Sequence, residues 1–305
     1  MLIPLAAWLL LAAGAEPQIS PARMGDDGFL RHEVRCQYQA GTTLIRVLPP
    51  DGARPPRVYP LLLVLPVEPG LEHRYGDGLA EVRRRQLHNR YGLIVAEPTF
   101  SQLPWYGDHP YDPQVRQESY LIEVVLPFLR THYPIGQGRE NCLLLGFSKS
   151  GWGAWSLLIR HPQLFERAAA WDAPVSMLAP DKYRMNVVFA TPESFRPYCL
   201  VTALARSADA LRGPPRLGLF GYGNFRDQHL AMHQRLVELG IPHAYRDGPW
   251  RKHIWESGWV SEAVEFLVTG KPSRRLPGLT PRGSPNSNWK WQTRGAIARF
   301  AEQKP

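Results

Sequence analysis

A serine stands at a predicted sharp turn between a buried strand and a helix rich in small residues. The run Cys142 to Leu145 is continuously apolar, which is typical of a strand covered on both faces. A helical pattern follows from Gly151 to about Ile159, and Ser148 lies between the two. Gly146 allows a tight turn, so the Ser148 hydroxyl would stand above the sheet beside a free backbone amide. The stretch predicts a nucleophilic serine.

The match to the usual G-x-S-x-G pattern is incomplete. Ser150 occupies the last position, and the glycine follows one residue later at Gly151. Because serine is small, we expect the turn to survive this exchange. This departure at Ser150 also keeps open the alternative that the protein has the fold but catalyses the reaction poorly.

A serine hydroxyl is a weak nucleophile unless a base takes its proton and a third group orients that base. The candidate base is His253, in a loop between the last predicted strand and the last predicted helix. For the acid we favour Asp227, which follows a predicted strand by a short loop, although N-capping of a helix is the alternative role. Asp247 is a second candidate on the His253 loop. Asp172 directly follows another strand, an unusual position for the acid, where it could instead shape the pocket floor.

The remaining parts of such a site are two amide donors and a pocket. The amide of Lys149 is the first predicted oxyanion donor, and the second is Val67, because the preceding Pro66 has no N–H. The aromatic loop 100–111 and an insertion over residues 175–212 are expected to shape the pocket. Stacking surfaces for a sugar or an aromatic alcohol are predicted at Trp105, Tyr106 and Trp152.

Apolar runs and helical patterns alternate along the chain. The predicted strands cover residues 32–39, 43–48, 59–65, 91–96, 142–145, 167–171, 216–222 and 243–246. The predicted helices cover residues 79–90, 117–132, 151–159, 228–240 and 261–268. This alternation predicts an α/β fold with a mostly parallel, doubly wound sheet and helices on both faces.

Charge and hydropathy set the two ends of the chain apart. The chain has 305 residues and a net charge of +9, but residues 271–305 hold eight Lys and Arg against one Glu, which places +7 in this segment. We expect a solvated basic tail there and no nucleic-acid partner. The apolar residues 2–15 resemble a secretory signal and predict a secreted or periplasmic protein. The folded domain is then 16–270, with no integral membrane span.

Cysteine usage and motifs indicate neither a metal nor a cofactor. The three cysteines are Cys36, Cys142 and Cys199, too few for a disulfide framework, although a Cys36–Cys199 bridge stays open. No C-x-x-C, H-E-x-x-H or phosphate-binding glycine loop occurs.

Several segments together resemble the putative-esterase, or esterase D, branch of the α/β-hydrolases, which includes mycolyltransferases and feruloyl esterases. The resemblance covers about residues 58–268 and rests on strand 61–65, Trp105-Tyr106, the Gln117-Glu118-Ser119-Tyr120 helix, the 146–154 elbow, Arg160-His161-Pro162, Phe165 and His253-Ile254-Trp255. It implies an α/β-hydrolase fold of about eight strands, with Ser148, Asp227 and His253 as the triad. The chain departs from the family at Ser150 and in the glycine-poor segment 65–69.

These observations predict a serine hydrolase that cleaves a carboxylic ester through an acyl-enzyme, without metal or cofactor. The expected substrate is a small-molecule or glycan ester. The alternative is a catalytically weak or inactive binding protein of the same fold. A peptidase of the prolyl-oligopeptidase type is disfavoured, because the chain shows no propeller repeats.

Overall fold

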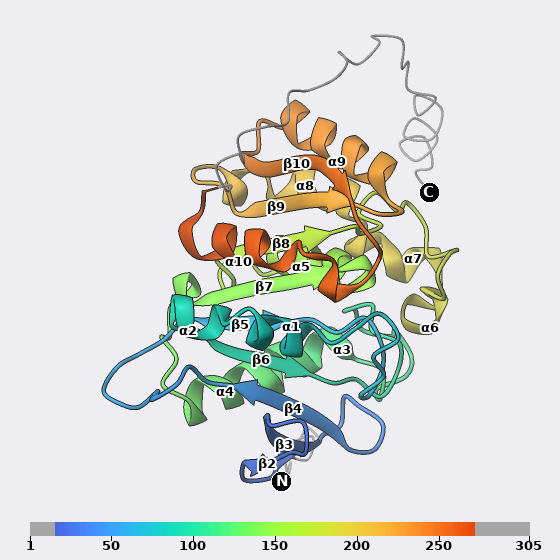
Figure 1. The fold of residues 1–305 in the computed structure, drawn as a ribbon. Coiled ribbons are helices and arrows are strands. Elements are labelled where there is room, and N and C mark those ends of the chain that lie inside the picture. The colour runs from blue at the N-terminus through green and yellow to red at the C-terminus, as the bar shows by residue number, and fades with distance from the viewer. Residues whose placement is uncertain (1–15, 272–305) are drawn as a thin grey trace, which may run out of the picture. The chain divides into compact units, whose positions relative to one another are not determined.

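The computed structural model describes residues 16–271, and one mixed sheet forms its centre (Figure 1). The sheet has ten strands in the order β1-β3-β4-β6-β5-β7-β8-β9-β10, with β2 paired to β3 off this path. The strands are β1 Gln18–Ile19, β2 Arg23–Met24, β3 Leu30–Arg35, β4 Thr43–Leu48, β5 Leu61–Val64, β6 Ile94–Pro98, β7 Cys142–Phe147, β8 Arg167–Trp171, β9 Leu217–Tyr222 and β10 His243–Trp250.

The sheet combines an antiparallel edge with a parallel remainder. Strands β1 to β4 and β6 pair antiparallel, whereas β6, β5, β7, β8, β9 and β10 run parallel in that spatial order. The predicted hairpin is present as β3 and β4. The strand count exceeds the expected eight, because the two-residue strands β1 and β2 add to the edge.

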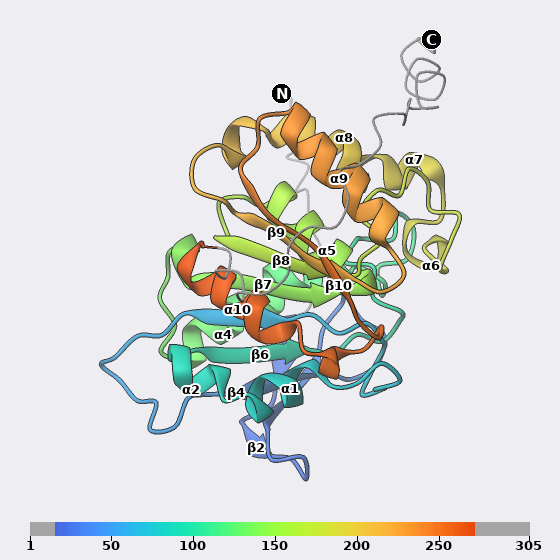
Figure 2. The same ribbon diagram turned by 45° about the horizontal axis from the view of Figure 1, so that its top comes forward.

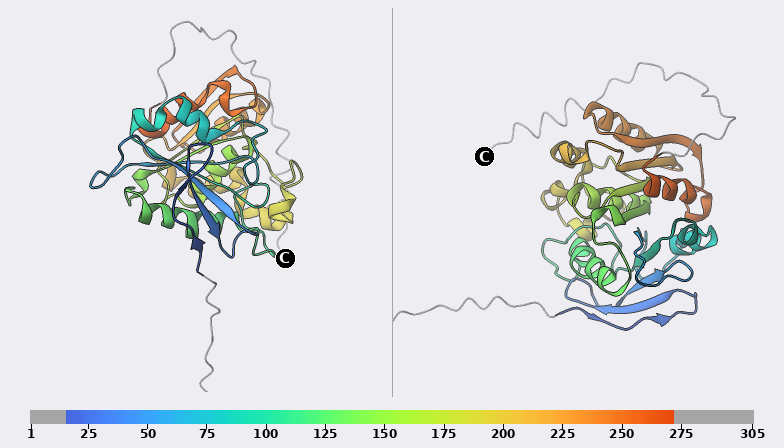
Figure 3. Two further views of the ribbon diagram at one scale, coloured as in Figure 1. Left: turned by 60° about the horizontal axis from the view of Figure 1, so that its bottom comes forward. Right: turned by 90° about the vertical axis from the view of Figure 1, so that its left-hand side faces the viewer.

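Helices cover both faces of the sheet, as the side view shows (Figure 3). Apolar side chains along β5 point alternately to the two faces of the sheet, so both faces are buried under helices. Leu61 and Leu63 belong to the core on one side, and Leu62 and Val64 belong to the core on the other.

The Leu62 side is covered by α1 Gly78–Arg84, α2 Leu87–Tyr91 and α10 Val260–Thr269. The Leu61 side is covered by α3 Gln117–Ser119, the π-helix η1 Tyr120–Val125, α4 Leu126–His132, α5 Ser148–Arg160, α8 Leu200–Ser207 and α9 Arg226–Glu238.

Two predicted helices are interrupted. The helix predicted over 79–90 divides into α1 and α2 at Gln86, whose φ of 55° ends the regular turn. The helix predicted over 117–132 contains the π-helical segment η1, which is followed by Pro127 in the first turn of α4. The Leu126 amide bonds the Leu121 carbonyl five residues back, and Pro127, which has no N–H, follows directly after this wider turn.

The segment 175–212 forms the short helices α6 Asn186–Phe189, α7 Pro192–Phe195, η3 Arg196–Tyr198, α8 and η4 Asp209–Leu211. Of these, α6 and α7 lie beyond the arrowheads of the central strands (Figures 1 and 2). This end of a parallel sheet is where ligands usually bind.

All three cysteines lie within the described residues and are free, so the structure has no Cys36–Cys199 bridge. Between residues 16 and 271, no helix combines the length and apolarity needed to cross a membrane. The predicted signal segment 1–15 and nearly all of the predicted tail lie outside the described residues.

Helix α5 packs so closely that Gly153 has no room for a side chain. A Cβ at this position would lie 2.1 Å from Cδ2 of Tyr106, which is itself fully buried. In an open helix interior, replacing glycine by alanine stabilises by about 1 kcal/mol. We predict the opposite sign for Gly153→Ala, a loss of about 1–3 kcal/mol through overpacking, measured by urea unfolding.

The control is Gln234→Ala, an exposed position on α9, which should change the free energy of unfolding by less than ~0.5 kcal/mol. An increase in stability for Gly153→Ala would contradict the packing described.

Candidate active site

Ser148 occupies the turn between β7 and α5 in a backbone conformation that residues other than glycine seldom adopt. Its φ is 53°, and Ser148 is 9 % exposed. A Cβ at Gly146 would lie 2.2 Å from the carbonyl oxygen of Ser150, so the strand can enter this turn only with glycine there. Strained backbone of this kind concentrates at functional sites.

Ser150 stabilises the turn rather than disrupting it. Its Oγ accepts a hydrogen bond from the Phe147 amide at 3.0 Å and donates one to the Phe147 carbonyl at 2.9 Å. The side chain is fully buried, so it ties the end of β7 to the first turn of α5. The fold therefore accommodates the departure from the usual glycine by satisfying the backbone through the hydroxyl.

Asp172 emerges beside Ser148 because the two preceding strands are in register. Phe147 at the end of β7 pairs with Trp171 at the end of β8, so the next residue of each strand leaves the sheet at the same level. Asp172 has a φ of 41° and is fully buried. Neighbouring strands lie about 4.8 Å apart, which brings the two turns close together.

The Asp172 carboxylate accepts several hydrogen bonds. The amides of Asn224 and Phe225 each donate to Oδ1 at 2.7 Å, and the ring of His253 bonds Oδ2 through Nδ1 at 2.5 Å. Burial alone would raise the pKa of Asp172, but these hydrogen bonds outweigh it, and the pKa is lowered. The carboxylate thus stabilises the fold above its ordinary pKa, and this contribution is lost as the pH falls through the lowered value.

His253 reaches this carboxylate from the loop after β10. Its ring packs against Phe147 at 4.8 Å and Tyr75 at 5.5 Å between centroids. The loop is fixed by the amide of Trp255, which donates to the Tyr75 carbonyl at 2.9 Å. Since a carboxylate only accepts, Nδ1 carries the proton, and Nε2 of the neutral ring is left as a base.

The prediction that Asp227 orients His253 is corrected by this geometry. Asp227 is an exposed residue in the first turn of α9, and Asp172 takes the place beside His253. Asp247 is likewise engaged elsewhere, in an ion pair with Arg226. The sequence did contain a signal for Asp172, because it directly follows the strand next to the serine strand.

Comparison with known proteins shows the family of the chain. Residues 105–304, about two thirds of the chain, match the family described as Putative esterase. The chain belongs to this family. No curated protein matches the chain.

Solved structures show the α/β-hydrolase fold for this esterase. A ferulic acid esterase superposes with a TM-score of 0.60 at 18% identity, covering 84% of this chain and 98% of that one. An S-formylglutathione hydrolase from Agrobacterium tumefaciens gives 0.62 at 15% identity, covering 82% and 99%. MPT51 (FbpC1) from Mycobacterium tuberculosis gives 0.57 at 14% identity, covering 83% and 100%.

Of the two predicted oxyanion donors of the esterase, Lys149 directly follows Ser148, and Val67 follows the neighbouring strand β5. Lys149 is the second residue of α5, where an amide has no acceptor within the helix. Val67 is 4% exposed and follows β5, which pairs with β7 and is extended by the Leu65 amide donating to the Leu145 carbonyl at 2.9 Å. The ends of β5, β7 and β8 therefore deliver Val67, Ser148 and Asp172 to one place.

The side chain of Lys149 is partly desolvated at this site. Burial lowers its pKa, the nearby cations Arg74 and Arg184 lower it further, and Glu68 acts in the opposite direction. The Lys149 side chain therefore lies among charged groups of both signs.

The predicted stacking surfaces are not surfaces in the structure. Trp105, Tyr106 and Trp152 are all fully buried. Trp152 packs edge-on against Trp105 at 5.7 Å and against Phe189 of α6 at the same centroid distance. These aromatic residues hold the insertion onto α5, and a substrate would have no access to their faces.

A cavity of about 410 Å³ offers a different binding surface. It is lined by Tyr183, Asn224, Phe225, Asp227 and Gln228. The rings of Tyr183 and Phe225 meet edge-on at 5.7 Å, and Phe225 lies 5.9 Å from the His253 ring. Phe225 therefore connects the lining of the cavity to the His253 ring.

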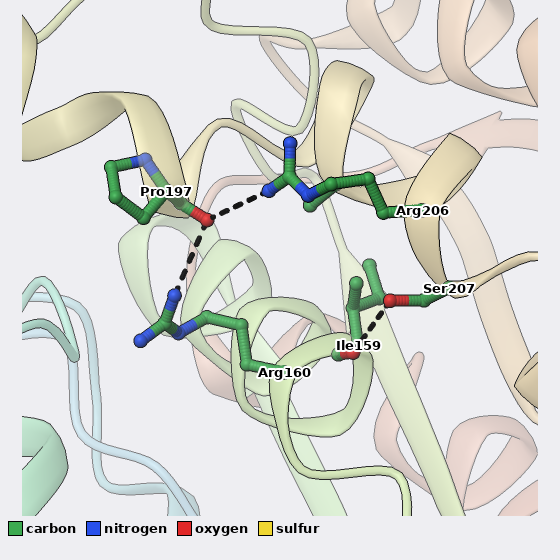
Figure 4. Close-up of a pocket in the computed structure, with 6 residues that line it drawn as sticks. Ile159, Arg160, Pro197, Arg206 and Ser207 are labelled. Atoms are coloured by element: carbon green, nitrogen blue, oxygen red, sulfur yellow. Dashed lines mark hydrogen bonds between the residues drawn. The ribbon is translucent and has the colours of Figure 1, made fainter.

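A second cavity, of about 260 Å³, lies at the far end of α5 (Figure 4). Arg160 and Arg206 both donate to the carbonyl of Pro197 there, at 3.3 and 3.4 Å. At about 1.5 Å per residue, Arg160 is ~18 Å along the helix from Ser148. This cavity is not part of the site.

Two supporting residues escaped the sequence analysis. Gly223 gives Asp172 room, because a Cβ there would lie 2.5 Å from Oδ2. His229 accepts a hydrogen bond from the Ala173 amide at 2.9 Å, and burial lowers its pKa to about 4, so it remains neutral. Within residues 16–271, no three His, Cys, Asp or Glu side chains converge to hold a metal.

We predict opposite outcomes for the two aspartates. Asp172→Asn should lower kcat on ethyl acetate by about 10³–10⁴, since an amide facing Nδ1 favours the wrong histidine tautomer. Asp227→Asn should stay within about threefold on this ester, which has no ring to occupy the cavity, and circular dichroism checks that both variants fold. The reverse pattern in steady-state kinetics would restore Asp227 as the acid.

Proposed function

We propose that the protein hydrolyses carboxylic esters through an acyl-enzyme formed on Ser148, with His253 as base and Asp172 as the orienting acid. The hydrogen bond between His253 and Asp172, in a loop packed against the residue before Ser148, is the observation that carries this proposal. Membership of the esterase family supports it independently.

The proposed reaction has two steps. Ser148 Oγ attacks the carbonyl carbon, its proton passes to Nε2 of His253, and the amides of Lys149 and Val67 stabilise the oxyanion. The C–O bond to the leaving alcohol then breaks, and His253 returns the proton to that alcohol. Water attacks the acyl-enzyme through the same base and releases the acid together with free Ser148.

We further propose that the cavity beside His253 receives a ring-bearing part of the ester. Two aromatic rings with amide and carboxylate groups around them suit an aromatic or sugar ring with hydroxyl groups. Export of the protein, which the apolar residues 2–15 suggest, remains part of the proposal.

The nucleophile is tested with a fluorophosphonate probe, which reacts with an activated serine whatever the substrate. We expect stoichiometric labelling of the wild-type chain and none of Ser148→Ala, because Ser148 is the serine that the proposed base and amides would activate. Hydrolysis of 4-nitrophenyl acetate should fall by at least ~10³ in the same variant.

Ser156→Ala is the matched control, a buried serine on the same helix, and should label normally. Folded wild-type protein that takes up no probe would favour the alternative of an inactive binding protein.

The pocket is tested with Tyr183→Ala. Tyr183 is 49% exposed and contacts Phe225, the residue that lies between it and His253. We expect kcat/KM for a ring-bearing ester, methyl ferulate or 1-naphthyl acetate, to fall about 3–10-fold, the worth of one aromatic contact. Ethyl acetate should change less than twofold.

Tyr111→Ala, an exposed tyrosine outside the cavity, is the control. Equal losses on all three esters would show that Tyr183 acts on the chemistry or on folding rather than on ring binding.

A further inference from the structure

The buried hydroxyl of Tyr106 donates a hydrogen bond to the carbonyl oxygen of Pro66. Pro66 immediately precedes Val67, the proposed second oxyanion donor. Tyr106 is fully buried and lies 40 positions along the chain, so this contact joins two separate loops above the sheet.

This contact fixes the direction of the Val67 amide. The two cis peptide bonds in the described chain precede Pro56 and Pro249, so the Pro66–Val67 peptide is trans. In a planar trans peptide the C=O and the N–H point in opposite directions. With its carbonyl held by Tyr106, the peptide must direct the Val67 N–H away from Tyr106.

We propose that Tyr106 is a positioning residue that holds the Pro66–Val67 peptide in the orientation needed to stabilise the oxyanion. This inference rests on the proposed function and adds a residue that no substrate would touch. The segment Leu65 to Pro69 needs such support, because it contains no glycine and its two prolines supply no amide.

Tyr106 is itself held firmly. Its backbone has a φ of 54°, and its amide and that of Trp105 both donate to Oε1 of Gln117, at 2.8 and 2.7 Å. The ring packs edge-on against Phe100 at 5.3 Å and leaves no space at Gly153. The hydroxyl therefore has one position available to it.

The hydroxyl also stays protonated. Burial raises the pKa of Tyr106 well above its usual range, and the nearby Glu97 raises it further, whereas Ser150 acts in the opposite direction. Since a carbonyl oxygen only accepts, the donor role of Tyr106 is the same at every pH of an esterase assay.

The experiment is Tyr106→Phe, assayed on 4-nitrophenyl acetate and on its thionoester analogue. Removing one oxyanion donor costs about 10²–10³ in kcat, and a misdirected donor should cost about 10–100-fold, with KM within threefold. Sulfur accepts hydrogen bonds weakly, so the thionoester should lose far less. The ratio of kcat on the oxygen ester to kcat on the thionoester should therefore be at least tenfold lower in Tyr106→Phe than in the wild type.

Tyr120→Phe is the matched control, because its buried hydroxyl bonds Thr43 at 2.9 Å and its ring packs on the same Phe100. It should keep the wild-type ratio. Tyr106→4-aminophenylalanine retains an N–H donor and should recover most of the lost rate. Should Tyr106→Phe fail to fold, Tyr106→4-fluorophenylalanine fills the hydroxyl volume without a donor and makes the same comparison.

Equal losses on the two esters, or an unchanged kcat, would overturn the positioning role while leaving the Ser148 mechanism intact. A wild-type chain whose esterase activity does not depend on Ser148 would instead overturn the proposed function. The two failures are therefore distinguishable.

Discussion

The pairing of Phe147 with Trp171 is the constraint from which the candidate site follows. Because β7 and β8 end at the same level, their next residues, Ser148 and Asp172, leave the sheet side by side. Both adopt positive φ, at 53° and 41°, and such conformations cost about 1–3 kcal/mol each. Their surroundings offset that cost, through the Ser150 hydroxyl on one turn and the amides of Asn224 and Phe225 on the other.

The loop after β5 contacts both the Tyr106 side chain and the loop that carries His253. At its beginning the Pro66–Val67 peptide is held by Tyr106, and at its end the carbonyl of Tyr75 holds the loop that carries His253. One irregular segment thus positions both the proposed amide donor and the proposed base. Its position depends in turn on β5, which is buried on both faces in the middle of the sheet.

Local patterns in the sequence were sufficient for the serine turn and for the histidine loop, because each is marked by residues adjacent in the chain. Local patterns do not identify Asp172 as the partner of His253, since their contact spans 81 positions and depends on a register that no local pattern records. Trp105, Tyr106 and Trp152 were mistaken for binding surfaces for a related reason. An aromatic residue can face solvent or the core, and here α6 and α7 pack on Trp152, Trp152 packs on Trp105, and Phe100 packs on Tyr106.

The burial of Tyr106 against α5 divides the rim of the site into a fixed part and an adaptable part. A substitution at position 106 must keep a ring that fits the space left by Gly153, and this ties the 100–111 loop to α5. The Tyr183 side chain, which lines the cavity, is half-exposed, so its replacement is not restricted by close packing in the same way. Diversification of substrate preference within this scaffold, by natural drift or by directed evolution, would therefore proceed through the 175–212 insertion.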